Sequence, residues 1–250
     1  MKVLPSCSSL IPHPSSLLRI PMPTDELLAV VGRADDLYRQ RARPGTVREA
    51  VMVLSGARGG NERYEVQWRL ARALFFLGQE ADSSGAKRQL HAAGINAGER
   101  AVVLNSERVE GHFWVGVNLA MFAESNGGIR GARALLWARS ELKLAARVNE
   151  SYHDAGPLRV LGRIEHKAPK LLGGNRKRSR QCFERALQIA PRNTVTLLYA
   201  AELAIDEGDR ARAISLLEQI IESPVGSEWE FENRRDQKLA RALLEKSGRA

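Results

Sequence analysis

A pattern that recurs after 34 residues constrains the fold of this chain more than any other feature. Its first copy combines a small residue, an aromatic residue, an alanine and a proline, at Ser179, Phe183, Ala186 and Pro191. The second copy follows 34 positions later, with its proline 33 positions later, at Ala213, Leu217, Ile220 and Pro224. A period of this length indicates repeated helix pairs, each of which buries its apolar face against its neighbours.

The rest of the chain favours α-helices. Apolar residues recur at intervals of three and four after residue 25, and no Asn-Gly or Asp-Gly turn lies between alternating runs, as a β-hairpin would require. Glycine, asparagine and proline mark the breaks between predicted helices at 25–42, 45–57, 62–78, 85–105, 109–125, 129–148, 155–167, 175–190, 194–207, 210–222 and 228–246. These ranges predict an all-α solenoid of about five antiparallel helix pairs and a C-terminal capping helix.

The repeated residues resemble the tetratricopeptide (TPR) family, whose second helix carries the same residue types at these offsets. Small residues let the two helices of a pair approach closely, the aromatic residue fills the space between successive pairs, and proline ends the second helix. The pattern of the first helix is partly kept, at Trp68, Phe75, Trp114, Leu161 and Gly162. We expect Trp68, Trp114 and Trp137 to lie in the core rather than to form a base-stacking stripe.

Three segments resemble one divergent TPR-like group. They read "GERAVVLNSERVEGHFWVGVNLA", "YHDAGPLRVLGRIEHKAPKLLGGN" and "CFERALQIAPRN", and the resemblance covers about residues 60–225. They are similar to the T component associated with periplasmic TRAP transporters (TatT-like proteins) and, more loosely, to eukaryotic regulators of microtubule dynamics. The resemblance implies a bent array that encloses a cavity for a small organic acid.

The first 23 residues are predicted to be a disordered leader, and residues 24–250 a single TPR-like domain. Prolines interrupt the leader, which lacks the apolar stretch of a secretion signal. The transporter proteins that the chain resembles are exported lipoproteins. Because this leader lacks a secretion signal, the sequence predicts a cytoplasmic protein. The alternative is a periplasmic protein, if an N-terminal signal is missing or misassigned. The charge-free run Phe113 to Ala123 is too short to cross a bilayer.

A net charge of +9 raises the question of an acidic partner. Both signs are mixed along most of the chain, so nucleic acid is not the expected partner. One segment is locally basic: a glycine-rich turn leads into a helix through Gly174, Arg176, Lys177 and Arg178. Such a turn can present backbone N–H groups to an anion, so these residues form a candidate anion site, and a solvated basic turn is the alternative.

A second candidate site lies in the groove expected on the concave side of the array. The first helices of a TPR array line this groove, where a peptide partner can bind. The alignment of Leu161 and Gly162 with the family pattern predicts four groove residues, at Arg69, Arg159, Arg163 and His166. They resemble, without the usual asparagine partners, a clamp for a C-terminal carboxylate. Pairing of the arginines with Glu165 or Glu202 is the alternative.

No pattern for catalysis or for metal or cofactor binding is found. The cysteines, Cys7 and Cys182, are far apart, and the histidines at 112, 153 and 166 lack a second ligand at helical spacing. We therefore predict no catalytic, cofactor or metal residue. The leading hypothesis is a non-enzymatic scaffold or adaptor that binds an unidentified protein or peptide in its groove. The alternative is a component associated with a TRAP transporter, with Arg159 and Arg163 facing a ligand pocket.

Overall fold

The computed structural model describes residues 23–226 and 228–248 of the chain. This part is helical and contains no β-strand. Eleven α-helices follow one another as α1 (Thr24–Arg39), α2 (Thr46–Ser55), α3 (Tyr64–Glu80), α4 (Ser84–Leu104), α5 (Val109–Ser125), α6 (Gly128–Val148), α7 (Tyr152–Lys167), α8 (Arg176–Ile189), α9 (Thr194–Glu207), α10 (Arg210–Glu222) and α11 (Glu230–Gly248). Short 3-10 helices occupy Gly60–Glu62 and Lys170–Leu172.

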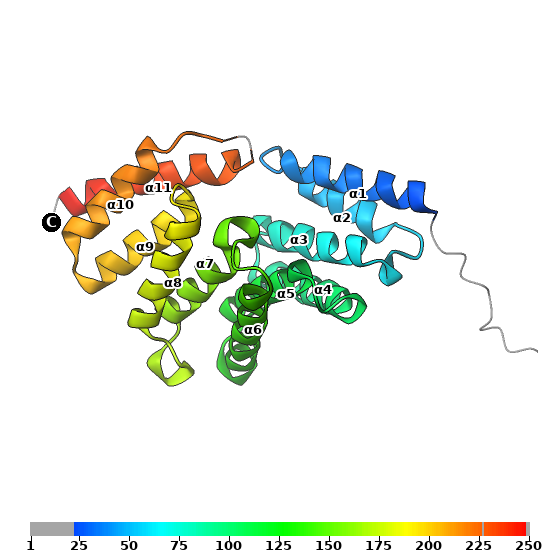
Figure 1. The fold of residues 1–250 in the computed structure, drawn as a ribbon, viewed down its shortest axis with the longest axis horizontal. Helices are drawn as coiled ribbons and strands as arrows, with labels where there is room; N and C mark the ends of the chain where they lie inside the picture. The colour runs from blue at the N-terminus through cyan, green and yellow to red at the C-terminus, as the bar shows by residue number, and fades with distance from the viewer. Residues whose placement is uncertain (1–22, 227, 249–250) are drawn as a thin grey trace, which may run out of the picture.

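The helices form five consecutive pairs, from α1/α2 to α9/α10, and α11 packs on the last pair. The predicted all-α solenoid with a terminal capping helix is confirmed. Figure 1 shows that the array curves until its two ends approach each other, with α11 beside the connection between α1 and α2. The curvature places α3, α5, α7 and α9 on the inner side, where they line a common cavity.

The repeated residues pack as the sequence predicts. Phe183 is 1% exposed and lies against Gly162, where a β-carbon would be only 2.6 Å from the Phe183 ring. The Ser179 hydroxyl donates a hydrogen bond of 2.8 Å to the carbonyl oxygen of Gly162. Small residues therefore bring α7 and α8 into close contact, and the aromatic ring fills the adjacent space.

One expectation needs correction. Trp137 was expected in the core together with Trp68 and Trp114, but it is 42% exposed on α6, whereas the other two are 7% and 1% exposed. In α7 a left-handed turn at residues 153–155 precedes the right-handed helix, which starts close to the expected residue 155. The predicted leader lies outside the described residues except for Pro23. No helix in the described part of the chain is long and apolar enough to cross a membrane.

Candidate functional site: a central chamber

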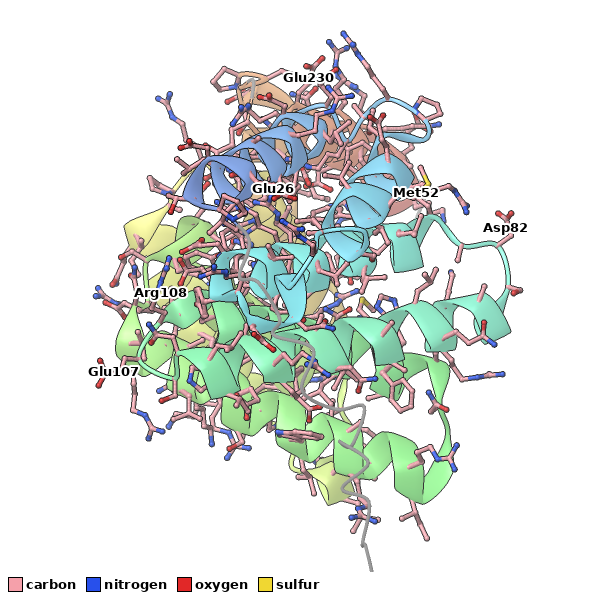
Figure 2. All side chains as sticks on the ribbon, turned by 90° about the vertical axis from the view of Figure 1, so that its right-hand side faces the viewer. Glu26, Met52, Asp82, Glu107, Arg108 and Glu230 are labelled. Atoms are coloured by element: carbon pink, nitrogen blue, oxygen red, sulfur yellow. The ribbon has the colours of Figure 1, made fainter. Side chains whose placement is uncertain are left out.

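The two ends of the array are joined by a buried ion pair. Arg41, which follows α1, donates to Glu232 of α11 from Nε to Oε1 at 3.0 Å and from Nη2 to Oε2 at 2.6 Å. Arg41 also donates to the backbone oxygen of Glu228, and its guanidinium lies 4.5 Å from the centre of the Tyr38 ring. Figure 2 shows the start of α11, marked by Glu230, close behind α1 and α2. The first and last parts of the array therefore meet at Arg41.

A partly open cavity of about 100 Å³ lies on the inner side of the array. Helices α3, α5, α7, α9 and α11 all contribute to its wall, which makes it the common centre of the repeats. The wall is largely aromatic, and its polar members are few: Gln79, His153, Arg159, Glu232 and Arg235. An apolar cavity with a few convergent polar groups is the usual form of a small-molecule site. We call this cavity the central chamber.

A left-handed turn at the start of α7 brings a histidine into the chamber wall. His153, Asp154 and Ala155 have φ values of 54°, 54° and 58°. Non-glycine residues in this conformation cost about 1–2 kcal/mol each, and such strain is concentrated at functional sites. The following residue, Gly156, has no room for a side chain, because a β-carbon would lie 2.8 Å from the Phe113 ring.

His153 is neutral in this setting. Its Nδ1 accepts from Nη2 of Arg159 at 3.2 Å, which leaves the proton on Nε2, 3.2 Å from the Tyr38 hydroxyl. Burial, followed by the nearby charges of Arg159, Arg72 and Arg41, holds the pKa of His153 well below its usual value. The rings of Trp229 and Phe113 lie 4.7 and 5.4 Å from the imidazole, centre to centre.

Arg159 differs from the other buried arginines of the described chain in its partners. Arg41, Arg72 and Arg139 each form an ion pair with a carboxylate, namely Glu232, Asp35 and Glu165, at 2.6, 2.6 and 3.1 Å. Arg159 is 4% exposed, and no ion pair of Arg159 is found among the described residues. It donates instead to the backbone oxygen of Asp154 at 2.9 Å and to Oδ1 of Asn193 at 3.4 Å. Burial lowers the pKa of Arg159, since nothing at contact distance balances its charge.

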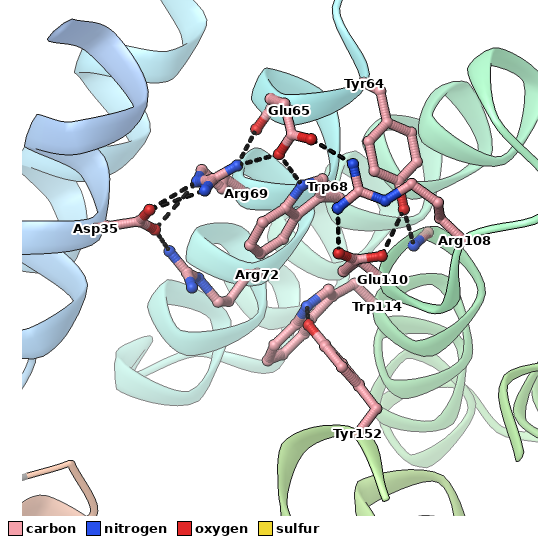
Figure 3. A network of polar contacts seen from close by, with 11 residues as sticks. Asp35, Tyr64, Glu65, Trp68, Arg69, Arg72, Arg108, Glu110, Trp114 and Tyr152 are labelled. Atoms are coloured by element: carbon pink, nitrogen blue, oxygen red, sulfur yellow. Dashed lines mark hydrogen bonds and ion pairs between the residues drawn. The ribbon is translucent and has the colours of Figure 1, made fainter. Parts of the chain in front are cut away.

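The other predicted groove residues are occupied by partners within the chain. Arg69 donates to Asp35 at 2.8 Å and to Glu65 at 2.6 Å, within the network drawn in Figure 3. Arg163 pairs with Glu202, which confirms the intramolecular alternative for this residue. Nε2 of His166 lies 2.7 Å from Oδ2 of Asp206, and burial lowers the pKa of His166. Of the four, Arg159 alone lies in the wall of the central chamber.

The candidate anion residues at the start of α8 are not gathered around one point. The backbone N–H of Gly174 donates to the Pro169 oxygen at 3.1 Å. Arg178 turns back to Glu165 at 2.9 Å, and its own N–H donates to the Asn175 side chain, which caps the helix. Arg176 and Lys177 are exposed. The Gly174 N–H and the Arg178 side chain are therefore engaged within the chain, and anion binding at this turn remains a prediction.

Sequence reasoning placed Arg159 on the inner side of the array but missed most of the chamber. Arg41, Glu232 and Trp229 are distant in sequence from the repeat motif and carry no local pattern of their own. The Gly-Pro pair at 156–157 indicated a helix start, because the residue before a proline is disfavoured in the helical conformation. The left-handed residues His153, Asp154 and Ala155 precede that pair and carry no sequence signal of their own.

Comparison with known proteins identifies the family. The sequence model of the TRAP transporter T-component family matches residues 61–249, about three quarters of the chain. The chain belongs to the TRAP transporter T-component family. This T component is also similar in fold to TTC0263, a thermophilic TPR protein from Thermus thermophilus, with a TM-score of 0.66, 20% identity, and coverage of 87% of this chain and 99% of that one.

Crystal structures of MamA resemble it more weakly. Two of them give a TM-score of 0.48 at 17% identity; one covers 88% of this chain and 99% of its own, the other 78% and 91%. The search of curated proteins gave no match. The chain thus combines a TPR-type fold, shown by the match to TTC0263, with membership of a transporter-associated family.

Proposed function

We propose that this T component is a non-catalytic accessory protein of a TRAP transport system and that it holds a small organic acid in the central chamber. Family membership supports the association with transport. The observation that supports an acidic ligand is the burial of Arg159, which lies in the chamber wall and has no ion pair among the described residues. A bound carboxylate would supply the missing negative charge and accept a charge-assisted hydrogen bond from the guanidinium, whose terminal N–H groups otherwise donate to His153, Asp154 and Asn193.

The chamber limits the size of the acid. Its volume is about 100 Å³, which is smaller than a cavity of roughly 150 Å³ that accommodates benzene. We therefore expect carboxylates of about two to four carbon atoms, with the apolar part against Phe113 and Trp114 and the carboxylate towards Arg159. Neutral His153 fits this role, because it orients Arg159 without adding or removing charge.

The alternative of a peptide in the concave groove has less support. The Arg41–Glu232 contact joins the two ends of the array, and Arg69, Arg163 and His166 are already paired within the chain. A peptide clamp would need these side chains to be free. A protein partner on the convex side is compatible with the ligand site, since that side of the array is not part of the central chamber.

Isothermal titration calorimetry with a series of unbranched carboxylates from formate to hexanoate tests the proposal. We expect binding that is strongest at two to four carbons and is lost in Arg159→Gln. Arg163→Gln is the matched control, because Arg163 is an arginine of the same helix that pairs with Glu202 and is absent from the chamber wall. Equal binding by the wild type and Arg159→Gln would refute the ligand site.

A further inference from the structure

A second surface feature lies on the convex side and is independent of the central chamber. Helix α5 packs against both α4 and α6, and residues of the three helices line an open cleft of about 750 Å³. In Figure 2, α4 runs between the labelled Asp82 and Glu107, and α6 lies below it. We call this cleft the α4–α6 groove.

The floor and one rim of the α4–α6 groove are apolar. Ile95 of α4 and Leu119 and Phe122 of α5 form the floor. On α6, Ile129, Leu136 and Trp137 are 81%, 56% and 42% exposed. Positions 129, 136 and 137 share one face of a helix, so these side chains form an exposed stripe beside the floor, with Arg133 between Ile129 and Leu136. Clustered apolar side chains of this kind mark an interaction site more often than isolated ones do.

The same stripe is positively charged. Arg130 and Arg133 line the α4–α6 groove, both are exposed, and neither has an ion pair among the described residues. Helix α6 carries five basic residues and one acidic residue, Glu141. That carboxylate is already engaged, since Oε2 lies 2.7 Å from Nδ1 of His112 and Oε1 accepts from Nε1 of Trp137 at 3.1 Å. The groove therefore combines apolar surface with uncompensated positive charge.

We propose that the α4–α6 groove binds an acidic amphipathic helix of a partner protein. An amphipathic helix buries its apolar face in such a groove, while acidic residues on its flanks meet Arg130 and Arg133. The distance along α6 from Ile129 to Trp137 corresponds to roughly 12 Å, or about two helical turns. Residues 1–22 of this chain do not match this chemistry, because they contain Lys2 and Arg19 but no acidic residue. A flat bilayer would touch the rim and leave the recessed floor uncovered.

A synthetic 18-residue peptide tests the proposal with the full chain. Its leucines occupy one face of the helix, and its glutamates flank that face. One control peptide has the same composition in scrambled order. A second control peptide has lysine in place of each glutamate. Trp137 reports binding through acrylamide quenching, and Trp137→Phe removes that signal. We expect micromolar affinity for the acidic amphipathic peptide and at least tenfold weaker binding of both controls.

Substitutions in the protein locate the site. Arg130→Glu with Arg133→Glu, and separately Ile129→Ser with Leu136→Ser, should each weaken calorimetric binding at least tenfold. The matched controls are Lys238→Glu with Arg241→Glu, two exposed basic residues of α11 at the same spacing, for charge and the 95% exposed Leu171→Ser for apolar surface, and neither should change it. All positions are exposed, and circular dichroism verifies the fold of each variant.

Three results would overturn the proposal. Binding could be unaffected by the groove substitutions, or vesicles with 30% anionic lipid could bind more tightly than the peptide through the same residues. Sedimentation of the free protein could also show a second copy of the chain in the α4–α6 groove, disrupted by Ile129→Ser with Leu136→Ser. None of these outcomes depends on carboxylate binding at Arg159, so the two sites are tested separately.

Discussion

Arg41 and Glu232 lie 191 positions apart in the chain and exchange two hydrogen bonds where the first and last parts of the array meet. Their side chains are 3% and 6% exposed. Both charges are buried, so the pair itself adds little net stability. Removal of one partner, however, would leave a buried charge without a counter-charge, which is strongly destabilising. Neighbouring TPR-type repeats contact each other in sequence order, and this ion pair adds a contact that such stacking does not provide.

Removal of one partner should therefore be costly. Arg41→Met leaves Glu232 buried without its cation, and we expect a loss of about 3–5 kcal/mol in the free energy of unfolding. Arg41→Met combined with Glu232→Met removes both charges and should recover most of that loss. Urea unfolding followed by circular dichroism measures both. A double variant as unstable as the single one would show that packing around the guanidinium, rather than its charge, holds the ends together.

Arg159→Met should cost less than Arg41→Met. No buried carboxylate is left without its cation, although acceptors of His153, Asp154 and Asn193 lose their donor, so without ligand we expect a loss of no more than about 1–3 kcal/mol in the free energy of unfolding. A short carboxylate should raise the melting temperature of the wild type but not of the variant, because a ligand stabilises only a state that binds it. Thermal unfolding with and without propionate checks both statements. A loss comparable to that in Arg41→Met would mean that the fold needs this charge for itself.

His153 should make the protein less stable in mild acid. In the folded protein its pKa is well below the usual histidine value of 6.5, while the unfolded chain takes up a proton near that value. Above pH 6.5 the residue is neutral in both states and costs nothing. As pH falls below 6.5 towards the folded pKa, the unfolded state binds more protons, so stability is lost by up to about 1.4 kcal/mol per pH unit.

His153→Asn isolates this effect, because asparagine tolerates the left-handed conformation and does not titrate. The variant should lose less stability than the wild type between pH 6.5 and 5, as measured by urea unfolding at each pH. Burial also lowers the pKa of His91, whereas the hydrogen bond to Glu141 raises that of His112, so only the difference between variant and wild type is informative. Parallel pH profiles would show that His153 is not kept neutral.

The sequence was sufficient for the repeat and insufficient for its closure. Helix periodicity and breaking residues predicted α5, α9 and α10 with their observed bounds, because these signals are local. The Arg41–Glu232 pair depends on the sum of the small rotations between successive repeats, which no local pattern records. Trp137 was misplaced for a related reason. A tryptophan at helical spacing is typical of a core, and its exposure follows from the gap between α4 and α6.

Within the site, sequence reasoning reached residues but not their partners. The TPR pattern placed Arg69, Arg159, Arg163 and His166 on the inner helices, yet only three-dimensional packing distinguishes Arg159, which lacks an ion pair among the described residues, from Arg163, which pairs with Glu202. Charge alone carries no such information, since the chain has 38 basic and 29 acidic residues. The proposed function depends on this difference between Arg159 and Arg163, because a buried cation without a counter-charge is stabilised by an anionic ligand, whereas a paired one is not.

The close contact between Gly162 and Phe183 should be detectable as an energetic coupling. In Gly162→Ala the new methyl group would lie 2.6 Å from the Phe183 ring, so overpacking of about 1–3 kcal/mol should exceed the helical preference for alanine of about 1 kcal/mol. Phe183→Leu removes the obstructing ring edge. The double variant should therefore be at least about 1 kcal/mol more stable than the sum of the two single effects predicts.

Gly32→Ala is the matched control for this cycle. Gly32 lies inside α1, and a β-carbon there would meet no atom within 4 Å. The same substitution should therefore raise the free energy of unfolding by up to about 1 kcal/mol, since only the helical preference acts. Opposite signs at Gly162 and Gly32 in urea unfolding would tie the destabilisation to the α7–α8 contact. Additive effects of Gly162→Ala and Phe183→Leu would instead show that the helix pair can separate without cost, against the packing on which the repeat depends.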